Sequence, residues 1–566
     1  MSANHLSSRR LVAVAAAGLL AAGLAACGSS SPSSSGSGSS SAATTLVMES
    51  SPETTITDDF NPFVSTAAPQ GMGATGLIYE PLLQFDLAAP PKYYQWLATS
   101  YAWSNGGKAI TFTIRQGVKF NNGTPMTPAD VVFTYNLIKK YAAINLAGLP
   151  ITSVSSSGND VTINFSTAEY LDLQQIAGVP ILPQSVWGSV SNPATFTDPK
   201  PVGTGPYVLK SFTPQGFTLT KSSYYWQASM VKVPNVYFPV YTSNTSAATA
   251  LFTGAIDWTG NFIEGLQKKF VDADPSEHSY WEAPGSSNAL IPNLNKWPTN
   301  QLAVRQAISL AVNRSLLASE GEAGLENPIT NTSGITLPTF QDWAGPASAD
   351  TVSATGSASA AEAVLAKAGY KKDSSGFYAL NGKEVTISLI APSSYTDYAA
   401  VGAMVASELK AAGINASFTG ISVDAWDADF ADGDFQLAEH WSNNGLTPYN
   451  LYDNWLDSSL NNGKANSGDY EGLKDAAIDA DLAKLAGDST VAQQTADLAP
   501  IETYVAQNLP VIAITTASEW FESNSQHWVG WPTQADPYET GQPTGTNTGA
   551  GAGTDEVVVL HLSPRK

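Results

Sequence analysis

Residue types that could do chemistry are few and scattered along this chain. Asp429, Asp432 and Asp434 cluster in a polar stretch and carry the groups of a general acid and a general base. No nucleophile with an accompanying base stands at motif spacing. We therefore expect these aspartates to be solvated carboxylates in a loop and the protein not to be an enzyme. A secreted hydrolase is the remote alternative. Four histidines lack the paired spacing of metal ligands and are expected in the core or at the surface: His278, His440, His527 and His561.

A glycine-rich stretch, residues 201–207, only superficially resembles a phosphate loop. It reads PVGTGPY, in which Pro206 removes a backbone donor, and no Lys followed by Ser or Thr comes after it. We expect these residues to form a turn, and we expect the protein to bind no nucleotide, metal ion or other cofactor.

The single cysteine, Cys27, stands where a covalent modification is expected. Arg9 and Arg10 precede an apolar run over residues 11–26, which is too short to span a bilayer comfortably and is typical of a secretion signal. The run ends in Leu-Ala-Ala-Cys-Gly, which resembles the lipobox of bacterial lipoproteins, where the thiol is acylated and the signal is cut before the cysteine. Residues 1–26 are therefore predicted to be a lipoprotein signal peptide and Cys27 the lipidated residue. An uncleaved anchor is the alternative, and the export route, general or twin-arginine, stays open.

The segment after Cys27 has the composition of a tether. Residues 28–41 are all Gly, Ser or Pro, which cannot bury apolar surface. Residues 27–45 are predicted to form a flexible linker that holds the folded body on the order of 20 Å from the membrane. No later stretch is long and apolar enough for a transmembrane helix. The body is thus expected on the extracytoplasmic face of the cell membrane, attached only through lipid.

Composition narrows the partners of this body. Roughly 520 residues follow the linker, the length of two to four domains. The net charge of −22 argues against nucleic acid and anionic lipid as partners. Fourteen Trp and twenty-two Tyr favour flat-faced ligands such as sugars or peptide side chains.

Hydrophobic periodicity predicts a mixed α and β chain. Residues 385–390 alternate as a strand, residues 399–412 repeat apolar side chains at helical spacing, and residues 414–418 begin another strand, which together make a βαβ unit. Thr127 is expected to cap a helix that has Pro128 in its first turn. Other predicted elements are strands at 111–114 and 161–165, a hairpin of 207–212 with 217–221, a helix from Gln301, a mobile loop at 541–553 and a final strand at 556–562.

Several short motifs occur in one order along the chain. The longest is residues 117–125, GVKFNNGTP, followed by Thr127 and by residues 129–133, ADVVF. The others are at residues 61–63 (NPF), 78–83 (IYEPLL), 201–207 (PVGTGPY), 254–258 (GAIDW) and 304–308 (VRQAI). With these motifs the chain resembles the extracytoplasmic solute-binding proteins of family 5, which include dipeptide, oligopeptide, nickel and oligosaccharide receptors of ABC importers.

The resemblance implies an α/β fold of the type II periplasmic-binding-protein kind, with two lobes hinged around a central cleft and an extra inserted domain. The first lobe would be discontinuous, formed by residues 46–89, 201–284 and 511–566. The inserted domain would be residues 90–200 and the second lobe residues 285–510. The βαβ unit falls in this second lobe.

The resemblance also points to ligand-binding residues. In the family's peptide receptors, a Trp followed three residues later by Asp holds the α-amino group of the ligand. Here Trp441 is followed by Asn444, which keeps a hydrogen-bonding group but loses the charge that pairs with an ammonium. Core packing or a turn is the alternative role for several of these residues. The full set is Phe63, Trp258, Asn261, Asn295, Tyr395, Asp397, Tyr398, Trp441, Asn444 and Tyr449.

The function implied is a solute-binding lipoprotein of an ABC importer that delivers a short oligomer to permease and ATPase subunits, acting as a monomer. Asn444 and the aromatic residues around Tyr395 and Trp441 favour a neutral oligosaccharide, since sugars offer hydroxyls to amides and apolar ring faces to aromatics. An oligopeptide is the alternative, and Asp397 would then hold its amino group.

Overall fold

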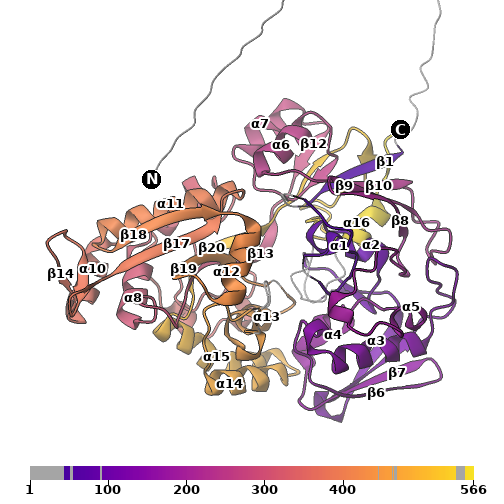
Figure 1. Cartoon of the computed structure of the whole chain (residues 1–566), viewed down its shortest axis with the longest axis horizontal. Coiled ribbons are helices and arrows are strands. Elements are labelled where there is room, and N and C mark those ends of the chain that lie inside the picture. Colours follow the sequence, from indigo (N-terminus) through magenta and orange to yellow (C-terminus); the bar gives the residue numbers. More distant parts are fainter. Residues whose placement is uncertain are drawn as a thin grey trace, which may run out of the picture. The chain divides into compact units, whose positions relative to one another are not determined.

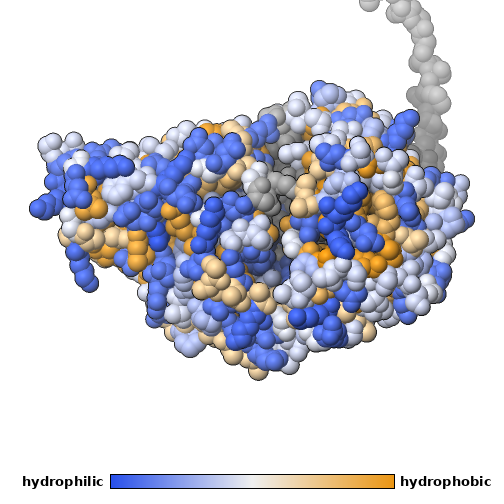
Figure 2. Space-filling view, turned by 60° about the horizontal axis from the view of Figure 1, so that its bottom comes forward, coloured by the Kyte–Doolittle hydropathy of each residue, from blue (hydrophilic) through white to orange (hydrophobic). Residues whose placement is uncertain are grey.

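The computed structural model describes residues 44–50, 55–64, 66–88, 92–443, 445–461, 463, 468–543 and 555–566. Two large sheets and one smaller one organise this part of the chain, with helices packed on them (Figure 1). The face drawn in Figure 2 is covered mostly by hydrophilic residues, as expected for a chain of net charge −22.

The first large sheet has seven strands in the order β12-β21-β11-β1-β10-β9-β8. The predicted hairpin is confirmed, because β8 and β9 pair antiparallel around the turn that precedes Gly216. A Cβ atom on Gly216 would lie 2.5 Å from the carbonyl oxygen of Phe238, so only glycine fits there. The strands are β1 (Thr45–Glu49), β8 (Tyr207–Thr213), β9 (Gly216–Lys221), β10 (Asn235–Pro239), β11 (Trp258–Thr259), β12 (His278–Tyr280) and β21 (Glu522–Asn524).

The second large sheet has the order β18-β17-β19-β13-β20. Its strands are β13 (Ala283–Pro292), β17 (Thr386–Pro392), β18 (Asn415–Ile421), β19 (Leu437–Trp441) and β20 (Ile512–Glu519). The βαβ prediction is confirmed: β17 and β18 are parallel, and α11 (Thr396–Ala411) joins them and packs on them. Its buried Val401, Val405 and Leu409 lie at helical spacing, and Gly413 takes a positive φ of 76° just beyond its end.

Two short connections join the large sheets. One leads from β12 into β13 and the other from β20 into β21. They run antiparallel beside each other, since Tyr280 is paired with Glu522, the Trp281 amide donates to the Phe521 carbonyl at 3.0 Å, and Ala283 is paired with Glu519. Hinge motion occurs at a few residues in loops or at the ends of elements, and these connections are of that kind.

The smaller sheet, β4-β5-β7-β6, is antiparallel throughout. It contains both predicted strands and packs against α3 (Pro128–Lys140). The predicted cap is confirmed as a capping box, in which the Thr127 amide donates to Asp130 Oδ2 at 2.9 Å. The strands are β4 (Ala98–Ser104), β5 (Ala109–Ile114), β6 (Ile151–Ser157) and β7 (Asp160–Phe165). This sheet lies within the predicted inserted domain, whose boundaries stay a prediction.

The predicted final strand is wrong, because residues Asp555–His561 form helix α16. The apolar run from Val557 to Leu560 is buried on all sides, and a short run of that kind does not reveal its period. Tertiary contacts decide the outcome: Gln84 and Tyr225 both donate to the Glu556 carboxylate at the start of this helix. Most of the loop predicted at residues 541–553 lies outside the described residues.

The remaining elements surround these sheets. The helix predicted from Gln301 is confirmed as α8 (Leu302–Ala311). The other helices of the described chain are α1 (Ala68–Gly71), α2 (Thr75–Ile78), α4 (Leu173–Ala177), α5 (Gln184–Trp187), α6 (Asn244–Phe252), α7 (Leu266–Lys269), α9 (Arg314–Leu316), α10 (Ala358–Lys367), α12 (Val423–Asp432), α13 (Tyr449–Leu456), α14 (Ala476–Ala486) and α15 (Val491–Asn508). The other strands are β2 (Leu83–Phe85), β3 (Tyr93–Gln95), β14 (Lys371–Lys372), β15 (Tyr378–Leu380), β16 (Lys383–Glu384), β22 (Trp528–Val529) and β23 (Ser563–Pro564).

Candidate functional site

Four of the predicted ligand-binding residues meet at one edge of the second sheet. Tyr395, Asp397 and Tyr398 lie at the start of α11, and Trp441 ends β19. The ring centroids of Tyr395 and Tyr398 are 5.9 Å apart, and those of Tyr398 and Trp441 are 6.5 Å apart. Tyr395 and Trp441 are half-buried, so both residues keep some exposed surface.

The topology explains why these residues meet. β17 ends at Pro392 and β19 ends at Trp441, and the two strands are parallel, so their carboxyl ends lie at the same edge. α11 begins immediately after β17 and places Asp397 in its first turn at that edge. In open α/β sheets, ligands bind at the carboxyl ends of the strands.

Behind the aromatic rings lies a group of buried carboxylates that the sequence did not reveal. Glu322, Glu326, Asp397 and Glu439, called here the acid cluster, are each 6 % exposed or less. Glu439 lies on β19 two residues before Trp441. Burial, and then the charges of all four acids, raise the pKa of Tyr398, whose ring centroid is 6.5 Å from that of Trp441. Glu322 and Glu326 come from the segment that follows α9.

Polar neighbours satisfy only part of the acid cluster. Asn288 donates to Glu326 Oε2 at 3.0 Å and accepts from the Tyr398 hydroxyl at 3.0 Å, and the amide of Ser518 donates to Glu326 at 3.1 Å. In contrast, both carboxylate oxygens of Glu322 and of Glu439 are buried without a hydrogen-bond partner among the described residues. In the described chain, no Lys, Arg or His forms an ion pair with any of the four.

Burial raises the pKa of every member of the acid cluster, and the charges of neighbouring carboxylates raise it further for three of them. Burial raises the pKa of Asp397 to about 6. It raises the pKa of Glu326 to about 8, with a further contribution from the charge of Asp397. Burial, and then the neighbouring carboxylates, raise the pKa of Glu322 and of Glu439 well above the usual range. Each rise means that burial and neighbouring acids make the ionised carboxylate costly.

Further buried carboxylates continue from the acid cluster toward the first sheet. Glu282 lies in the connection between β12 and β13, and its pKa is raised by burial and by the charge of Glu326. Burial, and then the charge of Glu282, raise the pKa of Glu522 on β21. Glu49, at the end of β1, accepts from Thr259 at 2.7 Å, and burial raises its pKa to about 7. Carboxylates therefore occur in both large sheets and in a connection between them.

Asn261, another predicted site residue, belongs to this second group. Its amide nitrogen Nδ2 donates to Glu49 and its backbone N–H donates to Glu522 at 3.2 Å. Asn261 is therefore close to the carboxylates, and its side chain is 3 % exposed.

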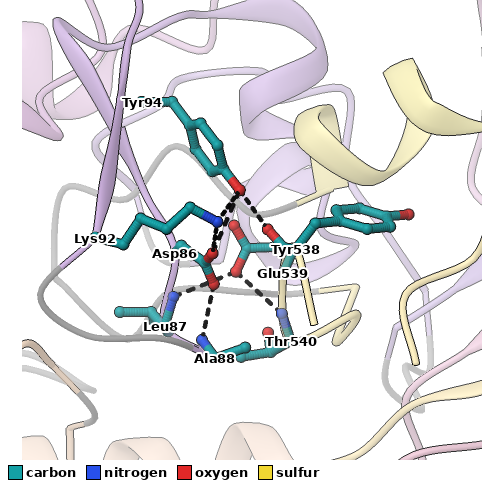
Figure 3. A network of polar contacts seen from close by, with 8 residues as sticks. All are labelled: Asp86, Leu87, Ala88, Lys92, Tyr94, Tyr538, Glu539 and Thr540. Atoms are coloured by element: carbon teal, nitrogen blue, oxygen red, sulfur yellow. Dashed lines mark hydrogen bonds and ion pairs between the residues drawn. The ribbon is translucent and has the colours of Figure 1, made fainter. Parts of the chain in front are cut away.

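One buried carboxylate elsewhere in the protein is paired with a cation from the chain itself. Asp86 is fully buried and lies 2.7 Å from the ammonium of Lys92, which also donates to the Tyr94 hydroxyl at 3.0 Å (Figure 3). Tyr94 in turn donates to the carbonyl of Tyr538 at 2.7 Å, so the network joins the β2–β3 hairpin to the C-terminal segment. The hydrogen bonds that Lys92 donates to Asp86 and Tyr94 raise the pKa of Lys92. Here the chain itself supplies the cation that the acid cluster lacks.

The remaining predicted residues lie apart from this edge. Trp258 is fully buried and donates to the Gly541 carbonyl at 2.7 Å, and Phe63 packs against Trp187 with centroids 6.3 Å apart, so both are core side chains. Asn295 is exposed and shapes a turn, because its backbone N–H donates to Asn293 Oδ1 at 2.9 Å. Cys27 and Asn444 lie outside the described residues.

Tyr449 contacts a different group of acids. Its ring is buried, and its hydroxyl lies 3.5 Å from Asp172 Oδ2, beside Asp453. Burial raises the pKa of Asp453 to about 8. These residues lie at the packing of α13 and α14 against the segment around Asp172.

The residues considered for catalysis or metal binding have structural contacts. Asp434 pairs with Lys296 at 2.6 Å, and His440 stacks on Trp426 with centroids 4.7 Å apart. Within the described ranges, no three His, Cys, Asp or Glu residues are placed to hold a metal ion. None of the described helices is long and apolar enough to cross a membrane.

Two lobes built on separate α/β sheets, joined by paired connections, define the class of periplasmic binding proteins. Residues 92–463 match the model of the bacterial extracellular solute-binding proteins, family 5. The chain belongs to this family.

Curated relatives and solved structures agree with this assignment. The nickel-binding periplasmic protein of Escherichia coli (strain K12) is 31 % identical over 277 residues, which cover 47 % of this chain and 52 % of that protein. The chain thus aligns with only about half the length of the curated relatives it matches.

Among solved structures, similarity extends over nearly the whole described chain. A mannohexaose-bound periplasmic oligopeptide-binding protein from Thermotoga maritima has a TM-score of 0.83 at 21 % identity and covers 92 % of this chain and 99 % of its own. The oligopeptide-binding protein AppA from Bacillus subtilis, in complex with a nonapeptide, has a TM-score of 0.75 at 19 % identity, with coverage of 92 % and 99 %. At these identities the likeness concerns the fold alone.

Proposed function

We propose that this protein is the solute-capturing lipoprotein of an ABC importer, anchored through Cys27, which binds a short oligomeric solute between its lobes and delivers it to the permease. The observation that carries the proposal is the gathering of Tyr395, Asp397, Tyr398 and Trp441 at the carboxyl edge of the second sheet. Membership in a family of bacterial extracellular solute-binding proteins supports the role, and one relative is a nickel-binding periplasmic protein.

The site offers two kinds of contact to an oligomer. Half-buried Tyr395 and Trp441 present ring faces, which suit a sugar ring or an apolar peptide side chain. Asn288 and Tyr398 offer polar groups that fix orientation. Oligosaccharide and oligopeptide both fit this description, and the structural relatives contain a mannohexaose in one protein and a nonapeptide in another.

Solution scattering combined with calorimetry tests the proposal. A panel of cello-oligosaccharides and of di- to pentapeptides would be titrated into the full chain. A binding solute should contact both lobes only when they are closed, so the radius of gyration should fall at saturation. An unchanged radius at saturation would contradict closure, and failure of Trp441→Ala to weaken binding would contradict the location of the site.

A further inference from the structure

The acid cluster carries an inference about the ligand that rests on the proposed function and goes beyond it. We propose that Glu322, Glu326, Asp397 and Glu439 bind ammonium groups of the transported solute, so that the ligand is an organic cation with more than one ammonium. The expectation of a neutral oligosaccharide does not account for these residues.

The acid cluster has no counter-charge among the described residues. Glu322 and Glu439 are each 0 % exposed, and none of their four carboxylate oxygens has a partner in the described chain. A buried, unpaired carboxylate is costly unless a cation or several donors reach it. Asp86 shows how this protein satisfies such a group when the partner is internal, with Lys92 at 2.7 Å.

The acid cluster lies beside the aromatic residues of the site. Asp397 precedes Tyr398 in the chain, and the Tyr398 hydroxyl donates to Asn288, which in turn donates to Glu326. The ring centroids of Tyr398 and Trp441 are 6.5 Å apart, so the acid cluster adjoins the aromatic edge proposed to hold the solute. Aromatic faces beside carboxylates attract alkylammonium groups through cation–π contact.

The carboxylates are spread over several segments of the chain. The acid cluster draws its members from three separate segments, and Glu282 extends it along the connection toward Glu522 and Glu49. In the described chain these carboxylates do not form a set able to hold one metal ion. A solute with ammonium groups at several positions matches such a distribution better than a single ion does.

Three sources share this chemistry: a polyamine, an oligomer of glucosamine and a lysine-containing peptide. Matched pairs of probes separate them, because acetylation removes the charge and leaves the backbone. Calorimetry on the full chain would compare spermidine with its fully acetylated derivative, the glucosamine trimer with the N-acetylglucosamine trimer, and trilysine with trilysine acetylated on its amines.

We expect the charged member of at least one pair to bind about 30-fold or more tightly than its acetylated partner, the effect of removing one side of a buried charge pair. Glu439→Gln and Glu322→Gln should each erase most of that difference while preserving size and fold. Asp434→Asn, which removes an exposed carboxylate paired with Lys296, should bind like the unaltered protein.

The pH dependence gives an independent readout. The groups that face one another are the acid cluster, Glu282 and the Tyr398 hydroxyl, and the acids must ionise to pair with a cation. Affinity for the charged probe should therefore rise between pH 5.5 and 8, and binding should release protons. At low pH the acids are protonated and cannot pair with ammonium groups, so the affinity for the charged probe should be lower there.

The outcomes are decisive in both directions. Neutral members that bind as tightly as charged ones would overturn the inference and leave the receptor function standing. Absence of binding by every charged probe would also overturn it, while closure on a neutral sugar or peptide would still support the receptor. Binding of Ni²⁺ or Mg²⁺ alone, lost in Glu439→Gln, would replace the organic cation by a metal ion.

Discussion

Asp397 allows the electrostatics of the acid cluster to be tested without any ligand. Its carboxyl is 6 % exposed in the first turn of α11, and burial raises its pKa from 3.8 to about 6. Each pKa unit corresponds to about 1.4 kcal/mol, so keeping this group ionised in the folded protein costs about 3 kcal/mol. Asp397→Asn keeps the shape of the protonated acid and removes that cost.

The sign of the effect follows from proton binding. Below pH 4 the carboxyl is protonated in both the folded and the unfolded protein, so it does not change stability. Between pH 4 and 6 the unfolded chain ionises first and is favoured, and above pH 6 the full penalty on the folded protein is present. The variant should therefore match the unaltered protein at pH 4 and be more stable at pH 7.

Calorimetry of the unliganded protein measures this difference. In a cooperatively unfolding unit of about 150 to 250 residues, a gain of about 3 kcal/mol corresponds to a rise in melting temperature of about 6 to 12 °C at pH 7. Asp434→Asn is the matched control, because Lys296 lowers the pKa of Asp434 and its removal should slightly destabilise at pH 7. An Asp397→Asn variant that is equally stable at both pH values, or less stable at pH 7, would refute the reasoning.

Three further changes test other parts of the molecule. Thr127→Ala removes the capping box of α3 and should cost about 1 kcal/mol of stability, measured by denaturant unfolding; an unchanged midpoint would contradict the role of the cap. Trp441→Ala should weaken solute binding by about 2 kcal/mol or more in calorimetry, as expected for an aromatic anchor, and an unaltered affinity would place the ligand elsewhere. Cys27→Ser should release the protein into the medium or leave its signal uncut, and a membrane-bound product of normal processed size would show that the anchor is not the lipid.

Local patterns predicted those elements whose side chains alternate between one buried and one exposed face. The βαβ unit of β17, α11 and β18 is of this kind. The start of α3 was predicted from a different local signal, the capping residue Thr127 followed by Pro128. The same patterns failed at α16, because a run of valines that is buried on every side has no exposed face to mark its period.

The candidate site was predictable only where chain neighbours supply it. Tyr395, Asp397 and Tyr398 are close in sequence, and the family motif pointed to Trp441, so their meeting was expected. Trp258 and Phe63 have residue types equally suited to a ligand platform and to a core, and only their burial against Gly541 and Trp187 distinguishes the two roles.

By itself, the sequence determined the family motifs and the βαβ unit of β17, α11 and β18, because each of these is encoded by residues adjacent in the chain. For the same reason it predicts the lipobox and the linker, which lie outside the described residues. The tertiary structure alone decided that Glu322, Glu326 and Glu439 meet Asp397. Their segments are far apart in the chain, and their approach depends on the order in which β19, β13 and β20 pair. No local pattern records that order, and an isolated Glu reads as a solvated side chain until folding removes the water around it.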